Sequence, residues 1–133
     1  MVDTVGGGDV VRADGFGRVD KPWGYELRWA ITDRYLGKVI HVDRGHKLSL
    51  QYHERKDESV YVLSGSLDLV LEDDAGELRT HRLVAGESAR IRTGRRHRFV
   101  AHEDVDLVEV SSPEIDDVVR VEDDYGREGT SHG

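Results

Sequence analysis

The sequence predicts a single all-β domain, a sandwich or a barrel of short strands. Short runs rich in β-forming residues follow one another from Trp23 to about Ser111, separated by polar or glycine-containing breaks. No long stretch with the helical period interrupts them. Nothing repeats at a fixed interval and no low-complexity linker divides the chain, so we expect its 133 residues to form one domain.

Alternation of apolar and polar residues defines the individual strands. It is clearest at 66–72, where Leu67, Leu69 and Leu71 fall on one face. The next residues, 73–76, predict a hairpin turn in which Gly76 supplies a positive φ. The expected strands cover residues 23–31, 35–42, 47–53, 59–64, 66–72, 77–83, 88–93, 97–102 and 105–110.

The two ends differ from this central region. Residues 1–18 are rich in Gly and Asp and lack periodicity, so we interpret them as a flexible N-terminal arm. We expect the barrel and a C-terminal extension to occupy residues 19–127, and a short tail to occupy 128–133.

Composition narrows the classes of partner. A net charge of −8 disfavours nucleic acid and anionic membranes, because binding to polyphosphate needs a basic face. No apolar run reaches the roughly 20 residues that cross a bilayer, and the N-terminus lacks the pattern of a secretory signal. We therefore expect a cytoplasmic protein that acts on a small molecule.

Four side chains predict a metal site. Gln51 and His53 are two residues apart on an expected strand and so point to one face. Glu58 opens the next strand and His97 opens a later one. Without cysteines, a metal must take His, carboxylate or amide ligands. Spacing alone leaves open whether these are ligands or ordinary polar residues.

Two longer patterns resolve this ambiguity. The residues from Gly45 to Gly65 resemble the first cupin motif, G-x5-H-x-H-x(3,4)-E-x6-G, with Gln51 in place of the first His. The residues from Gly86 to Ala101 resemble the second, G-x5-P-x-G-x2-H-x3-N. The resemblance implies a double-stranded β-helix, the cupin jelly-roll barrel. It also implies one divalent metal ion held by four ligands: Gln51, His53, Glu58 and His97. Zinc is favoured, with manganese, iron, cobalt and nickel as alternatives.

Three segments are more specifically similar to the C-terminal isomerase domain of type II phosphomannose isomerases: 21–26 (KPWGYE), 45–58 and 116–127 (DDVVRVEDDYGR). In that family Gln commonly occupies the first ligand position. The resemblance implies interconversion of an aldose and a ketose, with mannose 6-phosphate and fructose 6-phosphate as the family's pair. These enzymes are often fused to a guanylyltransferase, but its Gly-rich loop is absent here, so we do not expect nucleotidyl transfer.

Isomerisation needs a base beside the metal. Lys47 is our candidate, since strand parity points it inward and it matches the family's Lys; the alternative is a surface lysine. Lys56 either assists catalysis or is merely solvated. Ser49 shares the parity of Gln51 and is expected to contact the substrate. The resemblance also implies that Arg120 binds the phosphate of the substrate.

Other activities and assemblies stay open. A metal-dependent epimerase or oxygenase acting on another small polar metabolite is one alternative, and a non-catalytic sugar- or metal-binding module is another. We also expect a homodimer, because the segment 21–31 has the character of an exposed edge that a partner could cover.

Overall fold

The computed structural model describes residues 9–15, 17–127 and 129–131, and in this part of the chain it is built almost wholly from β-strands. A single 3-10 turn, η1 (Ala13–Gly15), precedes them. The first sheet contains, in spatial order, β1 (Gly17–Lys21), β2 (Gly24–Ile31), β3 (Leu36–Val42), β10 (Val105–Ser111), β5 (Glu58–Ser64) and β8 (Ser88–Ile91). The second contains β12 (Gly129–Ser131), β11 (Val118–Glu122), β4 (Leu50–Tyr52), β9 (His97–Ala101), β6 (Ser66–Glu72) and β7 (Leu78–Val84).

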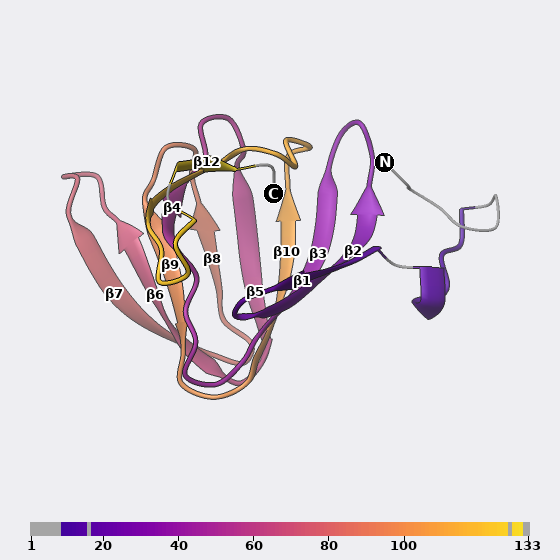
Figure 1. Ribbon diagram of the computed structural model, residues 1–133, viewed down its shortest axis with the longest axis horizontal. Helices are drawn as coiled ribbons and strands as arrows, with labels where there is room; N and C mark the ends of the chain where they lie inside the picture. The colour runs from indigo at the N-terminus through magenta and orange to yellow at the C-terminus, as the bar shows by residue number, and fades with distance from the viewer. Residues whose placement is uncertain (1–8, 16, 128, 132–133) are drawn as a thin grey trace.

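The chain passes repeatedly between the two sheets, which form opposing walls in Figure 1. β3 leads to β4 in the second sheet, β5 returns to the first, and later strands continue the exchange. All the strand pairs are antiparallel, and β10 lies between β3 and β5 although it follows them by far in sequence. This arrangement confirms the predicted all-β, double-stranded β-helix fold.

The core lies between the walls and follows the predicted alternation. Leu67 and Leu69 of β6 are 1% exposed, and Val62 and Leu107 from the opposite sheet are fully buried. Burial of such side chains is the main contribution to the stability of a domain of this size. The outward residues between them are polar or partly exposed, as expected for a sheet with one wet face.

The predicted hairpin at 73–76 is confirmed. Gly76 has a φ of 82° and its N–H donates to the carbonyl of Asp73 at 3.0 Å. The Asp73 carboxylate also accepts hydrogen bonds from the backbone N–H groups of Ala75 and Glu77. The aspartate closes the turn locally, and glycine supplies the left-handed backbone that the turn requires.

The N-terminal part of the barrel differs from the expectation in one respect. The segment 21–31 is not an edge, because β1 pairs along β2 and β2 pairs with β3 on its other side. β1 begins at Gly17, inside the expected flexible arm, and β12 lies inside the expected tail. Of those two segments, residues 1–8, 16, 128 and 132–133 lie outside the described residues, and the expected domain boundaries stay predictions.

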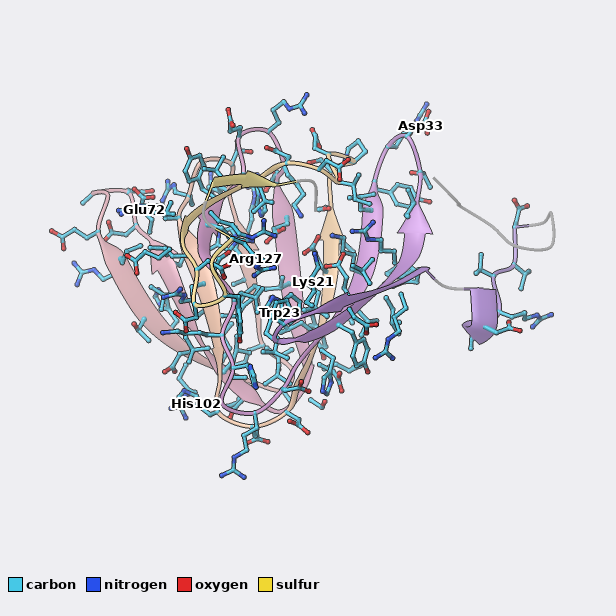
Figure 2. All side chains as sticks on the ribbon, viewed as in Figure 1. Lys21, Trp23, Asp33, Glu72, His102 and Arg127 are labelled. Carbon is cyan, nitrogen blue, oxygen red and sulfur yellow. The ribbon has the colours of Figure 1, made fainter. Side chains whose placement is uncertain are left out.

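Figure 2 shows Lys21, Trp23 and Arg127 toward the middle of the barrel, whereas Asp33, Glu72 and His102 lie at its periphery.

Within the described residues, no helix has the length and apolar character needed to span a membrane.

Candidate metal centre

Three buried side chains from separate parts of the sequence meet inside the barrel. His53 follows β4, Glu58 opens β5 and His97 opens β9, and each is at most 4% exposed. Nε2 of His53 lies 3.5 Å from one Glu58 oxygen, and Nε2 of His97 lies 3.6 Å from the other. One potential ligand atom from each residue lies within 4.8 Å of the other two. Two imidazoles and a carboxylate at this spacing suit a first-row divalent ion.

In both histidines a hydrogen bond made by Nδ1 determines that Nε2 faces the centre of the cluster. Nδ1 of His53 contacts the backbone carbonyl of Asp117, and Nδ1 of His97 contacts that of Arg95 at 2.9 Å. A carbonyl can only accept, so both Nδ1 atoms carry the proton and both Nε2 atoms present a lone pair. Both Nε2 atoms are buried without a hydrogen-bond partner. Such atoms are costly unless a ligand satisfies them, so the residues fit a metal ion.

The charge states also suit a metal. Burial, together with the positive charge of Lys56 nearby, lowers the pKa of His53 to about 3, so its imidazole is neutral. Burial alone would raise the pKa of Glu58. The Lys56 ammonium, 3.1 Å from the carboxylate, outweighs burial, and the pKa of Glu58 is lowered. Glu58 is therefore ionised and able to bind a cation.

Gln51 lies next to this cluster. The β4–β9 register pairs it with His97, and its side chain lines the same pocket as His53 and Glu58. Its Oε1 accepts a 2.6 Å hydrogen bond from the Ser49 hydroxyl, which holds the amide in place. This position is compatible with the predicted fourth ligand. Ser49 is itself 1% exposed and lies behind Gln51, outside the set of pocket-lining residues, so it supports the amide.

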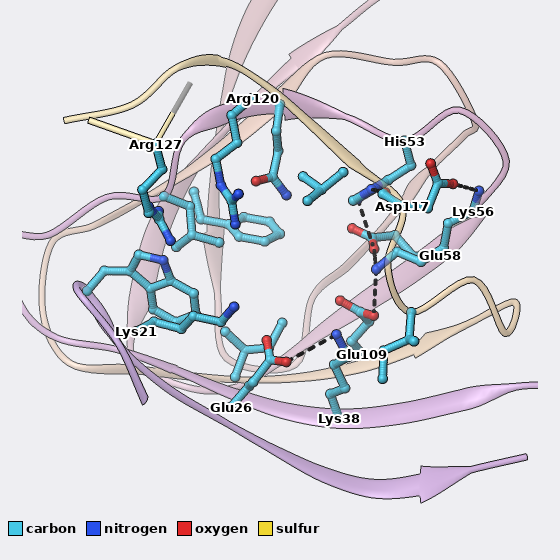
Figure 3. Close-up of a pocket in the computed structure, with 17 residues that line it drawn as sticks. Lys21, Glu26, Lys38, His53, Lys56, Glu58, Glu109, Asp117, Arg120 and Arg127 are labelled. Atoms are coloured by element: carbon cyan, nitrogen blue, oxygen red, sulfur yellow. Dashed lines mark hydrogen bonds and ion pairs between the residues drawn. The ribbon is translucent and has the colours of Figure 1, made fainter. Parts of the chain in front are cut away.

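Buried charges of alternating sign cover one wall of the pocket. Lys38 pairs with Glu26 at 3.3 Å, and Lys56 pairs with Glu58 and with Glu109 at 3.1 and 3.3 Å. The β3–β10 register sets Lys38 directly opposite Glu109, and all five side chains are at most 5% exposed. Figure 3 shows these residues as a continuous row. The row supplies hydrogen-bond donors and acceptors to a polar ligand.

Sequence reasoning missed three members of this row, although a signal was present. Lys38 has the same parity as the buried Leu36 and Ile40 on β3, and Glu109 has the same parity as Leu107 on β10. A charge inside an apolar stripe of a strand indicates a functional or paired group, because an isolated buried charge is expensive. Glu26 carries no comparable signal, because Gly24 and Arg28, the residues of the same parity in β2, form no apolar stripe.

Arg120 reaches the pocket from the opposite side. It is 7% exposed, and its Nε and Nη1 are buried with no hydrogen-bond partner. The register pairs it with Gln51, and Figure 3 shows it pointing into the pocket on the same side as Arg127 and Lys21. An unsatisfied buried guanidinium suits an anionic ligand, so its placement is compatible with the predicted substrate contact.

Lys56, one of the two predicted catalytic lysines, lies in the pocket wall. Burial would lower its pKa, but the Glu109 and Glu58 carboxylates outweigh burial and raise the pKa above the ordinary value. Its ammonium is held between two carboxylates, where it positions Glu58.

The inward orientation expected for Lys47 is wrong. Its side chain is 38% exposed and pairs with Asp124 at 3.3 Å, and it does not line the pocket. β4 begins only at Leu50, and Leu48, Ser49 and Leu50 are all buried. Alternation therefore does not extend back to Lys47, which makes only an isolated bridge with Val100.

Comparison with known families and proteins identifies relatives of the chain. The sequence matches the cupin domain family over residues 38–111. It is 33% identical over 115 residues to the xanthan biosynthesis protein XanB of Xanthomonas campestris, covering 83% of this chain and 24% of that protein. It is 36% identical over 114 residues to the mannose-1-phosphate guanylyltransferase ManC of Salmonella typhimurium, covering 82% and 23%. The chain spans about a quarter of the length of these relatives.

Solved structures show the same architecture. KdgF from Halomonas sp. superimposes with a TM-score of 0.64 at 29% identity, covering 73% of this chain and 86% of that chain. Oxalate decarboxylase from Bacillus subtilis superimposes with a TM-score of 0.71 at 16% identity, covering 80% and 30%. The second likeness concerns the fold alone, and a shared fold does not define the reaction.

Proposed function

The chain belongs to the cupin domain family, and we propose that it is a metal-dependent isomerase interconverting an aldose and a ketose. A sugar phosphate of the mannose 6-phosphate and fructose 6-phosphate type is the proposed substrate. The observation that carries the proposal is a convergent His–Glu–His cluster, two of whose members line the same pocket as a buried arginine with two unpartnered nitrogens. The name of one relative, mannose-1-phosphate guanylyltransferase, supports a phosphorylated hexose as the substrate class.

In this proposal the metal is held by His53, Glu58, His97 and Gln51, with zinc favoured among first-row divalent ions. The two unpartnered Nε2 atoms support the site, and the Ser49 hydroxyl fixes the amide of Gln51. When bound, a divalent ion polarises a carbonyl or hydroxyl oxygen and stabilises the negative charge that develops in an enediol pathway.

The remaining pocket residues bind and orient the sugar. Arg120 takes the phosphate, because a guanidinium grips phosphate oxygens through two parallel hydrogen bonds and its Nε and Nη1 have no other partner. The buried pairs of Lys38 with Glu26 and of Lys56 with Glu109 form hydrogen bonds with the hydroxyl groups of the sugar. Trp23, 4% exposed, and Phe99 supply apolar surface in the same pocket, and both help to keep water from the reacting carbons.

Exchange of the C2 proton with solvent deuterium tests this function. The metal-loaded chain is incubated in D₂O with aldoses and ketoses, both free and phosphorylated, and NMR follows exchange at C2 of the aldoses and at C1 of the ketoses. We expect exchange with the phosphorylated hexoses. We expect Arg120→Ala to raise KM for these substrates far more than it lowers kcat, and the exposed Arg34→Ala to change neither. Absence of exchange with every aldose and ketose contradicts the proposal.

We further propose that two copies of the chain associate through the outer face of the first sheet. Trp29, Tyr61, Leu63 and Val110 are 38–57% exposed. The ring of Trp29 covers Gly37, and the registers place Gly37 beside Val110 and Val108 beside Tyr61. A contiguous apolar stripe on a sheet face is typical of an interface, and a second copy supplies the same stripe in a two-fold contact.

A further inference from the structure

We propose that Glu26 is the catalytic acid–base of this pocket, the group that carries the proton between the two carbons of the substrate. This inference rests on the proposed isomerase function and supplies the base that Lys47, paired with Asp124 outside the pocket, does not provide.

Glu26 is anchored through one oxygen. Its Oε1 accepts from Nε of Arg28 at 2.9 Å and lies 3.3 Å from Nζ of Lys38. Figure 3 shows the other oxygen of Glu26 turned toward the open centre of the pocket. The residue is 5% exposed and lines the same pocket as His53 and Arg120. Glu26 also interacts electrostatically with the Lys21 ammonium in the same pocket. A carboxylate that is anchored through one oxygen and directs the other into a pocket is arranged for proton transfer.

The other carboxylates that line this pocket are committed elsewhere. Glu58 faces the two imidazoles. Glu109 shares the Lys56 ammonium with Glu58 and so belongs to the support of the metal site. The two Asp117 oxygens accept three backbone N–H groups from residues 54–56.

The proton balance needs no further reactant. The Glu26 carboxylate removes the proton from C2 of the aldose. The C–H electron pair forms the C1=C2 bond, and the carbonyl π pair moves to O1. The proton on O2 then passes to O1 as C2=O2 forms, and Glu26 returns its proton to C1. The carboxylate is regenerated, and the net change moves one hydrogen from C2 to C1 and one from O2 to O1.

The test compares wild-type protein with Glu26→Gln, with Glu109→Gln and with the exposed Glu77→Gln. We expect Glu26→Gln to slow C2 exchange and isomerisation by at least about 100-fold, with bound metal per chain unchanged. Glu109→Gln is expected to lower metal content, and Glu77→Gln to match wild type. Glu26→Asp preserves the charge, and we expect it to fold and to lose roughly tenfold or more in the rate of isomerisation, because its carboxylate is set back from the reacting carbon.

Three outcomes distinguish a failure of this inference from a failure of the function on which it rests. Wild-type exchange together with full exchange by Glu26→Gln, or by Glu26→Asp, overturns the role of Glu26 and leaves the isomerase intact. Wild-type protein without any exchange overturns both. If Glu26→Gln loses its metal in parallel with its activity, the residue is structural and the catalytic role is wrong.

Discussion

The backbone carbonyl of Asp117 accepts a hydrogen bond from Nδ1 of His53, and this contact joins the C-terminal segment to the candidate metal centre. The same residue uses its carboxylate to accept the N–H groups of Glu54, Arg55 and Lys56 at 3.1, 2.7 and 2.8 Å. Asp117 therefore fixes both the tautomer of His53 and the loop that leads to Glu58. Groups that orient a metal ligand in this way commonly alter metal affinity when they are changed.

Replacement of Asp117 is expected to weaken the site. In Asp117→Asn the amide presents only one acceptor to three N–H groups, so we expect a loss of about 2 kcal/mol in the free energy of unfolding. We also expect metal affinity to fall roughly 10- to 100-fold. Denaturant unfolding and metal titration measure the two effects. The exposed neighbour Asp116→Asn is the control, and equal metal affinity in the two variants contradicts the positioning role.

Two glycines of the cupin motifs should respond differently to alanine. Gly65 and Gly86 both have a left-handed backbone, with φ of 86° and 92°. A Cβ added at Gly65 would lie 2.3 Å from the carbonyl oxygen of Asp104. A Cβ added at Gly86 would have no atom within 4 Å. Both substitutions carry backbone strain of about 1 kcal/mol. We expect Gly65→Ala to lower the free energy of unfolding by about 1 to 3 kcal/mol more than Gly86→Ala does. Denaturant unfolding measures the difference, and equal unfolding midpoints for the two variants would contradict this explanation.

The stability of the protein should depend on pH through His41. Its Nδ1 lies 2.7 Å from Asp106 and its Nε2 lies 3.2 Å from Asp43. Burial would lower the pKa of His41, but the hydrogen bond to Asp106 and the nearby carboxylates outweigh burial and raise the pKa above 6.5. The stabilisation is then fully present below pH 6.5 and is lost as pH rises through the folded-state pKa.

The measurement is the difference in thermal unfolding midpoint between wild type and His41→Gln. We expect the difference to be larger near pH 6 than near pH 9, because the imidazolium pairs with both aspartates only at the lower pH. The exposed His81→Gln serves as the control. A difference that grows toward alkaline pH contradicts the sign of the pKa shift.

The outer apolar stripe predicts a dimer that one charge can disrupt. Leu63 is 57% exposed on β5, and Leu63→Lys places an ammonium in the proposed contact. We expect wild-type protein to show the mass of two chains by light scattering and Leu63→Lys to show the mass of one. Leu78→Lys, at an exposed position on the second sheet, should leave the mass unchanged. A wild-type mass of one chain contradicts the dimer.

The sequence predicts most of this fold because alternation survives wherever a strand has one buried face. Residues 66–72 illustrate this: they lie in β6 as expected, with Leu67 and Leu69 in the core. β1 was missed, since Gly17–Lys21 contains a single β-branched residue, Val19, and lies at a sheet edge with little burial. The orientation predicted for Lys47 was wrong for a related reason. The alternation of side chains holds only within a strand, and β4 has three residues and begins at Leu50.

The site was predictable to the extent that it is encoded in local motifs. His53, Glu58 and His97 converge as their motif positions imply. The buried pairs of Lys38 with Glu26 and of Lys56 with Glu109 join residues on different strands. A single sequence does not reveal such pairs, because the strand register decides which charges lie opposite one another.

Metal content tests the central claim most directly. Purified wild-type protein, equilibrated with zinc or manganese and then desalted, is examined by elemental analysis beside His53→Ala, His97→Ala and the exposed His81→Ala. We expect about one divalent ion per chain in wild type and in His81→Ala, and loss of the ion in the other two. Retention of the ion by either His53→Ala or His97→Ala would contradict the metal centre described above.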